Sequence, residues 1–147
     1  MSERPILIAY DGSKYAKAAI KQAAAQLQNG RQAIVLTVWQ LYSGGFAPSV
    51  GVVPEGMREQ VESDARRVAE QGAKLARKAG FDAEPVTESG DSIWRRIVDS
   101  AEERDADIVV MGSHGRTGLS HLVLGSVAER VASHTERPVL IAHSAAK

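Results

Sequence analysis

The sequence contains no cysteine. This excludes disulfide bonds, thiolate nucleophiles, iron–sulfur clusters and zinc sites with cysteine ligands. It also lacks an excess of charge, since 18 Lys and Arg balance 18 Asp and Glu to a formal net charge of zero. Proteins that bind DNA or RNA usually carry a basic surplus that neutralises phosphates, and aromatic residues for base stacking are few here. We therefore expect no nucleic-acid partner.

No apolar run approaches the roughly 18 residues that a membrane-spanning helix needs, and the N-terminal residues do not resemble a signal peptide. The sequence thus predicts a cytoplasmic protein without a membrane partner. A length of 147 residues, 44% of them hydrophobic, is enough for a packed core. We expect one domain that spans residues 1–147.

Short, continuous apolar runs alternate with amphipathic helical patterns along the chain. The runs, which are typical of strands buried on both faces, cover residues 6–9, 34–38, 108–111 and 139–142. A weaker candidate at 83–87 contains Pro85, which favours an edge strand. Helical spacing covers residues 13–28, 55–79, 93–101 and 119–131. This alternation predicts an α/β fold: a doubly wound, Rossmann-like sheet of five parallel strands with helices on both faces.

Several residues mark the expected ends of these elements. Gly30 and Gly80 stand where helix C-caps belong, and Asp91 or Ser92 is expected to cap the third helix. The glycine- and proline-rich segment 40–54 predicts a long loop. Such a loop is often a lid or a partner surface, or is simply mobile, and these alternatives stay open.

Ligands of doubly wound sheets bind beyond the carboxyl ends of strands, where the direction of winding reverses. The first strand ends at Asp11, the second at Val38 and the fourth at Met111. Asp11 precedes Gly12 and Ser13, so it is either a turn former or a ligand-binding residue.

The fourth strand leads into the glycine-rich segment GSHGRTGLSHLVLGS, residues 112–126. Its glycines are expected to allow positive φ angles and close approach to a ligand, and Gly125 and Ser126 stand near a helix N-terminus that favours phosphate. A tight turn before a helix is the structural alternative. The coincidence of two glycines, a later Gly-Ser pair and a strand end favours phosphate binding. Neither a Walker A loop nor G-x-G-x-x-G is present.

The segments ILIAYDGS, GDSIWRRI, ADIVVMGSHGRTGLSHLVLGSVAERV and RPVLIAHS resemble the universal stress protein family over almost the whole chain. The family's nucleotide pattern, G-x2-G-x9-G-[ST], is matched by Gly112, Gly115 and Gly125-Ser126. The resemblance implies the strand order 3-2-1-4-5 and places the sequence in the ATP-binding branch.

The resemblance also implies roles for individual residues. Asp11 is expected beside the nucleoside or its metal ion, with Mg²⁺ bound through the phosphates, and the main chain of Val38 beside the adenine. The rest of the predicted ATP site consists of Met111, Gly112, His114, Gly115, Arg116, Gly125, Ser126 and Val127. In it, Gly112 and Gly115 are expected to admit ribose and phosphates, and the last three residues to hold the phosphate tail.

The sequence thus favours an ATP-binding module of the stress response over a fast enzyme. The alternatives are a slow ATPase or nucleotidyl-transfer enzyme that uses the same pocket, and an interaction protein that binds no nucleotide. No G-x-S-x-G elbow or Walker lysine supports the enzyme. The strand Val139–Ala142 carries no charge, and with the family's order it forms a sheet edge, so we expect a homodimer joined through it.

Overall fold

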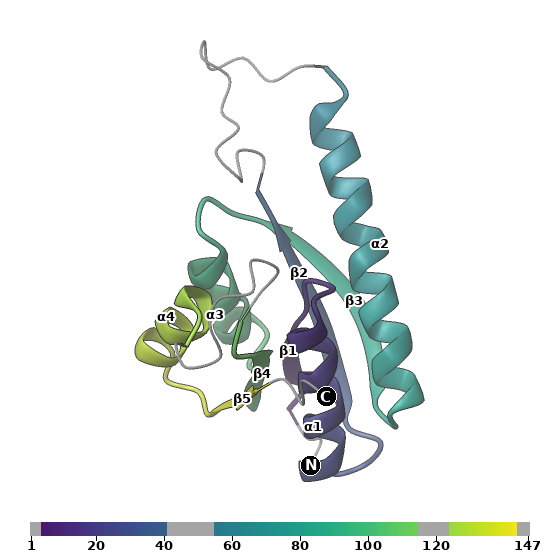
Figure 1. Cartoon of the computed structure of the whole chain (residues 1–147), viewed down its shortest axis with the longest axis vertical. Helices are drawn as coiled ribbons and strands as arrows, with labels where there is room; N and C mark the ends of the chain where they lie inside the picture. The colour runs from purple at the N-terminus through teal and green to yellow at the C-terminus, as the bar shows by residue number, and fades with distance from the viewer. Residues whose placement is uncertain (1–3, 41–54, 115–123, 144–147) are drawn as a thin grey trace.

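The computed structural model describes residues 4–40, 55–114 and 124–143 (Figure 1). The elements alternate along the chain: β1 (Ile6–Ala9), α1 (Lys14–Gln26), β2 (Gln32–Trp39), α2 (Met57–Lys78), β3 (Asp82–Ser89), α3 (Ile93–Glu103), β4 (Ile108–Gly112), α4 (Ser126–His134) and β5 (Val139–Ala142). The strands pair in parallel in the order β3-β2-β1-β4-β5. The predicted fold class and strand order are confirmed.

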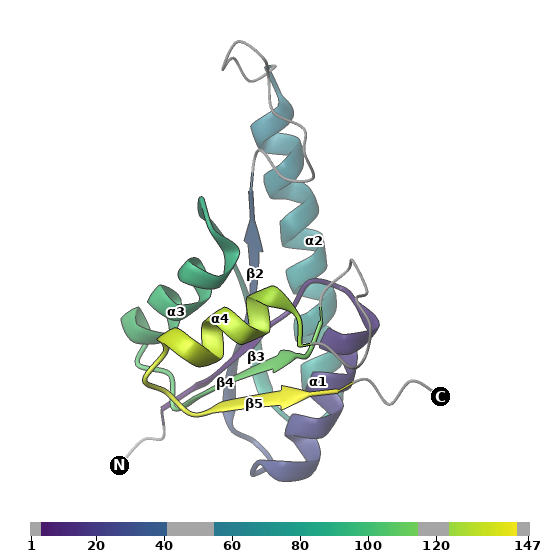
Figure 2. The ribbon, with the colours of Figure 1, turned by 60° about the vertical axis from the view of Figure 1, so that its left-hand side comes forward.

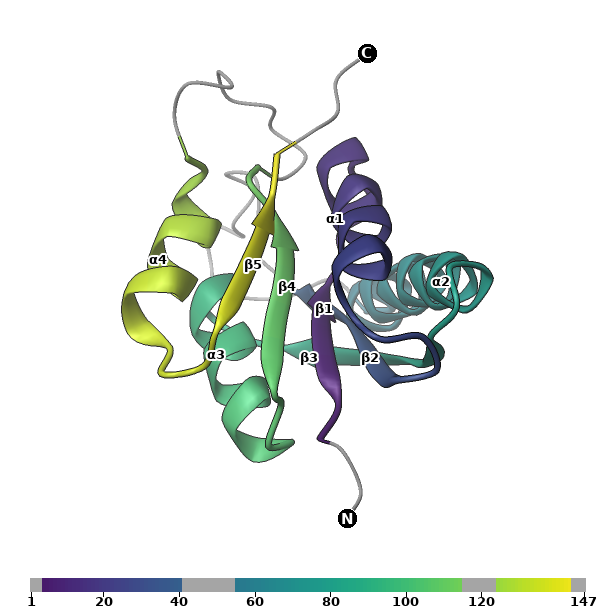
Figure 3. The same ribbon diagram turned by 90° about the horizontal axis from the view of Figure 1, so that it is seen from below.

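Helices cover both faces of the sheet, with α1 and α2 on one side and α3 and α4 on the other (Figure 3). Alternate strand residues point to opposite faces, so Ile6 and Ile8 of β1 join the core under α1 and α2 while Leu7 joins the core under α3 and α4. All three side chains are fully buried. This two-sided burial explains why the strand sequences are continuous apolar runs rather than alternating ones.

Helix α2 lies close against the sheet because the face it buries consists of small residues. A Cβ on Gly72 would approach the Tyr10 ring to 2.6 Å and a methyl carbon of Val35 to 2.8 Å. The N-terminal half of α2 extends beyond the sheet together with the end of β2 (Figure 2).

The two edge strands differ in character. β3 contains Pro85 and carries Asp82, Glu84 and Glu88, which protect a free edge against pairing. The prediction that Pro85 marks an edge strand is confirmed. β5 has no charged residue, and three of its four side chains are half-buried.

The element ends differ from the sequence expectations at two places. α1 ends at Gln26, so Gly30 is not its C-cap but a turn residue with φ +82° before β2. α4 begins only at Ser126, after the extended N-cap Gly125, and residues 119–123 of the expected helix lie outside the described residues. The N-cap of α3 is Ser92, one of the two residues predicted for it, although its side chain makes no capping hydrogen bond.

Residues 41–54, which make up most of the expected long loop, lie outside the described residues. None of the helices in the described ranges has the length and apolarity that crossing a bilayer requires.

Candidate functional site

A cavity of about 720 Å³ lies over the carboxyl ends of β1, β2 and β4. In the sheet, β2 lies on one side of β1 and β4 lies on the other. The direction of winding therefore reverses at β1, and the cavity lies at this switch point. Two of the ten predicted site residues, Gly115 and Arg116, lie outside the described residues. The other eight all line the cavity: Asp11, Val38, Met111, Gly112, His114, Gly125, Ser126 and Val127.

Asp11 shapes the turn that follows β1. Its Oδ1 accepts a hydrogen bond from the main-chain N–H of Ser13 at 3.0 Å. Ser13 is the N-cap of α1, and its hydroxyl accepts from the N–H of Ala16 at 3.1 Å. The carboxylate therefore orders the start of α1 and lines the cavity at once, so the two alternatives given by the sequence are compatible.

Successive residues of a strand direct their peptide groups to opposite neighbouring strands, and this alternation turns the main chain of Val38 toward the cavity. Leu36 directs its carbonyl toward β1, where it accepts from the N–H of Tyr10 at 2.9 Å, and Trp39 directs its carbonyl toward β3, where it accepts from Gly90 at 3.3 Å. Peptide groups two residues apart point the same way, so those of Val38 point toward β1. The β1–β2 pairing ends at Ala9 and Leu36. Val38 thus presents an N–H and a carbonyl beyond the end of that ladder.

Apolar side chains from three elements surround this main chain. Val38 from β2, Ile93 and Ile97 from α3, and Met111 from β4 all line the cavity and all belong to the core under α3 and α4. Of these, Met111 and Ile97 are buried to 5% and 3% exposure. The arrangement is an apolar slot beside main-chain donors and acceptors, which suits a flat heterocycle.

Gly112 lines the cavity but is required for another reason. A Cβ at this position would lie 2.7 Å from the carbonyl carbon and the Cβ of Tyr15. The close approach it permits is thus to α1. Gly112 is an ordinary residue of β4 and is not among the glycines with positive φ, so the expected positive φ at this position is wrong.

Gly125 also serves the packing of the chain. Its N–H donates to the carbonyl of Ser113 at 2.8 Å, so this N–H is bonded within the chain while the residue itself lines the cavity. The N-cap offers no side chain to the first turn of α4. A helix leaves the N–H groups of its first turn without intrahelical partners and carries partial positive charge there. Ser126, Val127 and Ala128 form this turn and line the cavity.

His114 is buried beside Ser113, with 6% and 1% of their surfaces exposed. Its Nδ1 lies 2.9 Å from the hydroxyl oxygen of Ser113, and its ring packs 5.1 Å from that of Tyr15. The sequence predicted that His114 is a polar loop residue near the phosphates. His114 does line the cavity, but its side chain is buried.

Sequence reasoning missed five lining residues that carry polar groups: Tyr10, Thr37, Trp39, Gln40 and Asp64. The hydroxyl of Tyr10 donates to Oε1 of Gln71 at 2.7 Å, and burial together with the charge of Asp11 raises the pKa of the phenol. The hydroxyl of Thr37 donates to the carbonyl of Tyr10 at 2.8 Å. For Tyr10, Thr37 and Gln40, the sequence signal was their position at the ends of β1 and β2. Residues that follow the last paired residue of a strand at the switch point line the cavity there.

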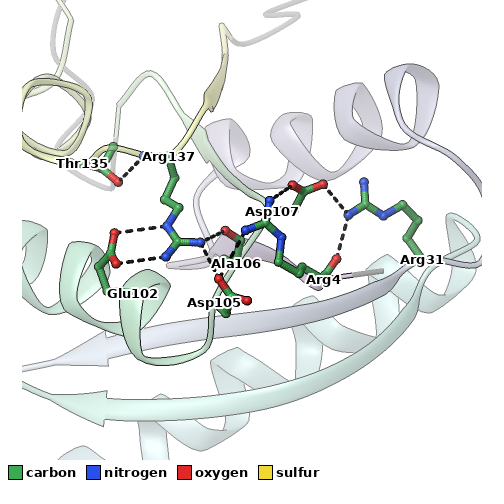
Figure 4. A network of polar contacts seen from close by, with 8 residues as sticks. All are labelled: Arg4, Arg31, Glu102, Asp105, Ala106, Asp107, Thr135 and Arg137. Atoms are coloured by element: carbon green, nitrogen blue, oxygen red, sulfur yellow. Dashed lines mark hydrogen bonds and ion pairs between the residues drawn. The ribbon is translucent and has the colours of Figure 1, made fainter. Parts of the chain in front are cut away.

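A second cavity of about 320 Å³ lies at the opposite end of the sheet. It is bordered by paired charges, with Arg137 bound to Glu102 and Asp105 at 2.9 Å each and to the carbonyl of Ala106 at 2.7 Å (Figure 4). Hydrogen bonds from Arg137 lower the pKa of both carboxyl groups. These ion pairs connect the end of α3 to the residue that precedes Pro138 and β5. Within the described ranges, no cluster of three or more His, Asp or Glu residues is placed to hold a metal ion.

The comparison with known proteins agrees with this geometry. The model of the universal stress protein family matches residues 3–143. The chain belongs to the universal stress protein family. Universal stress protein MJ0531 of Methanocaldococcus jannaschii is 32% identical over 141 residues, which cover 94% of this chain and 81% of that protein.

Solved structures of universal stress proteins share the fold. Protein MJ0577 of M. jannaschii is similar with a TM-score of 0.79 at 28% identity, and the match covers 97% of each chain. The universal stress protein of Archaeoglobus fulgidus in complex with dAMP is similar with a TM-score of 0.64 at 27% identity, over 97% of this chain and 99% of that one.

Proposed function

We propose that this universal stress protein binds ATP in the cavity over β1, β2 and β4 and acts as a nucleotide-binding module of a stress response. The observation that carries the proposal is the composition of one cavity, which combines an apolar slot with the first turn of α4. A volume of about 720 Å³ lies within the range of small-molecule sites, about 300–1,000 Å³. The relative from A. fulgidus, which binds dAMP, supports an adenine nucleotide as the class of ligand.

The two halves of the cavity suit the two halves of the nucleotide. The adenine lies between Val38, Met111 and Ile93, where the main chain of Val38 reads its edge. The phosphates extend to the first turn of α4, where the N–H groups and the helix dipole stabilise negative charge. Mg²⁺ is bound through the phosphates, with Asp11 as the neighbouring carboxylate. Residues 115 and 116 remain part of the proposal on the family pattern alone.

The protein is further proposed to be cytoplasmic and homodimeric. The contrast between the two sheet edges supports the dimer, because β3 is protected by a proline and acidic residues and β5 is not. A two-fold axis would pair β5 with the same strand of a second copy.

A single negative charge at the start of α4 tests the proposal. In S126D the carboxylate stands where the phosphates are expected, while an acidic residue at a helix N-terminus is neutral or favourable for folding. We expect calorimetric titration to show ATP affinity at least about tenfold weaker than in wild type, equivalent to about 1.4 kcal/mol. The matched control is S133D, which places the same change at the exposed far end of the same helix. Equal ATP affinity in S126D and wild type would overturn the placement of the phosphates.

A further inference from the structure

The side chain of Gln40 crosses the rim of the cavity directly after β2. Its Nε2 donates a hydrogen bond to the main-chain carbonyl of Asp91 at 2.7 Å, in the turn between β3 and α3. The neighbouring main-chain bond from Gly90 to Trp39 keeps these two segments together. Gln40 is half-buried and lines the cavity.

The Asp91 contact fixes which way the amide of Gln40 faces. A carbonyl oxygen only accepts hydrogen bonds, so the nitrogen of the amide must lie on the side of Asp91. Turning the amide over would bring its oxygen against the carbonyl oxygen of Asp91, which replaces a hydrogen bond by a repulsive contact. Because the partner belongs to the main chain, this restraint does not depend on a second side chain.

Among the described residues, neither the acceptor Oε1 of the restrained amide nor its second N–H has a bonding partner. Gln40 follows the last residue of β2, and its side chain lines the same cavity as Val38 and Ile93. The free edge of the amide therefore borders the slot that the proposed function assigns to the base.

We propose that Gln40 contributes to base specificity, accepting from the exocyclic amino group of adenine and donating to the ring nitrogen N1, on the edge of the base that the main chain of Val38 does not read. Adenine presents this donor and acceptor side by side, and the acceptor oxygen and donor N–H of a glutamine amide match the pair. Hypoxanthine presents the reverse pattern at positions 6 and 1, an acceptor and a donor. It could be matched only by an amide turned away from Asp91. The inference rests on the proposed function, because it assumes that the base occupies this slot.

The experiment compares ATP with inosine triphosphate, which differ only at position 6 and the adjacent ring proton. In calorimetric titrations with Mg²⁺, we expect wild type to bind ATP at least about tenfold more tightly, in the range of bidentate base contacts. Q40M keeps the length of the side chain but neither accepts nor donates, so its preference should fall at least about threefold below that of wild type and keep only the part that the main chain of Val38 supplies. Q40E accepts but does not donate, so it should favour inosine triphosphate relative to wild type.

The matched control is Q22M, an equivalent change at an exposed position of α1 that does not line the cavity. It should keep the wild-type preference, and urea unfolding should be the same for wild type and Q22M. If wild type binds ATP but does not discriminate, or if Q40M discriminates as wild type does, the role of Gln40 is overturned and the proposed function stands. If wild type binds neither nucleotide, the proposed function is overturned and this inference with it.

Discussion

The main-chain N–H of Gly125 donates to the carbonyl oxygen of Ser113 at 2.8 Å, and a Cβ on Gly125 would lie 2.7 Å from that same oxygen. This contact joins the residue before α4 to the residue after β4. It sets the position of the first turn of α4 relative to the cavity. The glycine is thus needed to place the first turn of α4, to which the proposed function assigns the phosphates.

Replacement of Gly125 should therefore affect folding as well as binding. From the sequence alone, a valine at this position is expected to obstruct the phosphates and leave the fold intact. The contact with Ser113 is between main-chain atoms and cannot relax by rotation of a side chain. We expect G125V to lower the free energy of unfolding by about 1–3 kcal/mol in urea titrations. Wild-type stability in G125V, with S126A as the neighbouring control, would contradict this role.

The proposed dimer can be tested through the main chain of β5. Pro138 and Ala142 direct their carbonyls to β4, where they accept from Val109 and Ser113, so the peptide group of Ile141 points to the free edge. I141P removes that outward N–H and leaves the β4 ladder intact. Light scattering should give about twice the 15.7 kDa chain mass for wild type and a single chain mass for I141P.

I141T is the control for the dimer, since it alters the same half-buried side chain but keeps the N–H. It should remain dimeric. A wild-type protein that is monomeric at micromolar concentration would refute the dimer itself, and a dimeric I141P would place the interface elsewhere.

The charge network at the other end of the sheet predicts a specific dependence on pH. Hydrogen bonds from Arg137 hold the pKa values of Glu102 and Asp105 below their ordinary values. A lowered folded-state pKa stabilises the protein above the unfolded-state pKa of about 4, and this stabilisation is lost as the pH falls through the folded-state value. R137M lacks this stabilisation at every pH, because the guanidinium that lowers the two pKa values is absent.

The unfolding temperature of R137M should thus be lower than that of wild type near pH 6, and the difference should shrink steadily below about pH 4. Thermal unfolding followed by circular dichroism between pH 7 and pH 2.5 measures this. R130M, a change at an exposed position of α4, should show no such convergence. A difference between wild type and R137M that is constant over this range would contradict the assigned cause.

Nucleotide turnover should be slow. The described carboxylates that line the cavity are Asp11 and Asp64, and both are held by neighbours: Asp11 orders the turn after β1, while Asp64 bonds Gln60 and Arg67. We expect phosphate release from ATP well below about 1 s⁻¹, the lower end of typical enzymes. Faster turnover that is lost in S126D would favour the ATPase alternative.

The sequence predicted the fold well because its signals were local and independent. Continuous apolar runs such as Ile108–Met111 require burial on both faces, and helices between them require parallel pairing. The ends of elements were less predictable. Gly125 stands inside a helical pattern, and only the three-dimensional contact with Ser113 shows that α4 begins after it.

The candidate site was predictable where it follows from the ends of strands, as for Asp11 and Val38. Gln40 could not be identified from the sequence, since its orientation depends on the carbonyl of Asp91, fifty-one positions further along the chain. The reason for Gly112 was likewise hidden, because the residue that requires it is Tyr15 on α1. Contacts between distant segments carry no local sequence signal.

The central claim is that the nucleotide lies between the end of β2 and the start of α4, and amide NMR tests it most directly. On titration of the ¹⁵N-labelled protein with ATP and Mg²⁺, the largest shift changes among the described residues should occur at Val38, Gln40, Ser126, Val127 and Ala128. Amides around Arg137, at the opposite end of the sheet, should not change. Absence of changes at both β2 and α4 under saturating ATP, or changes concentrated around Arg137, would contradict the claim.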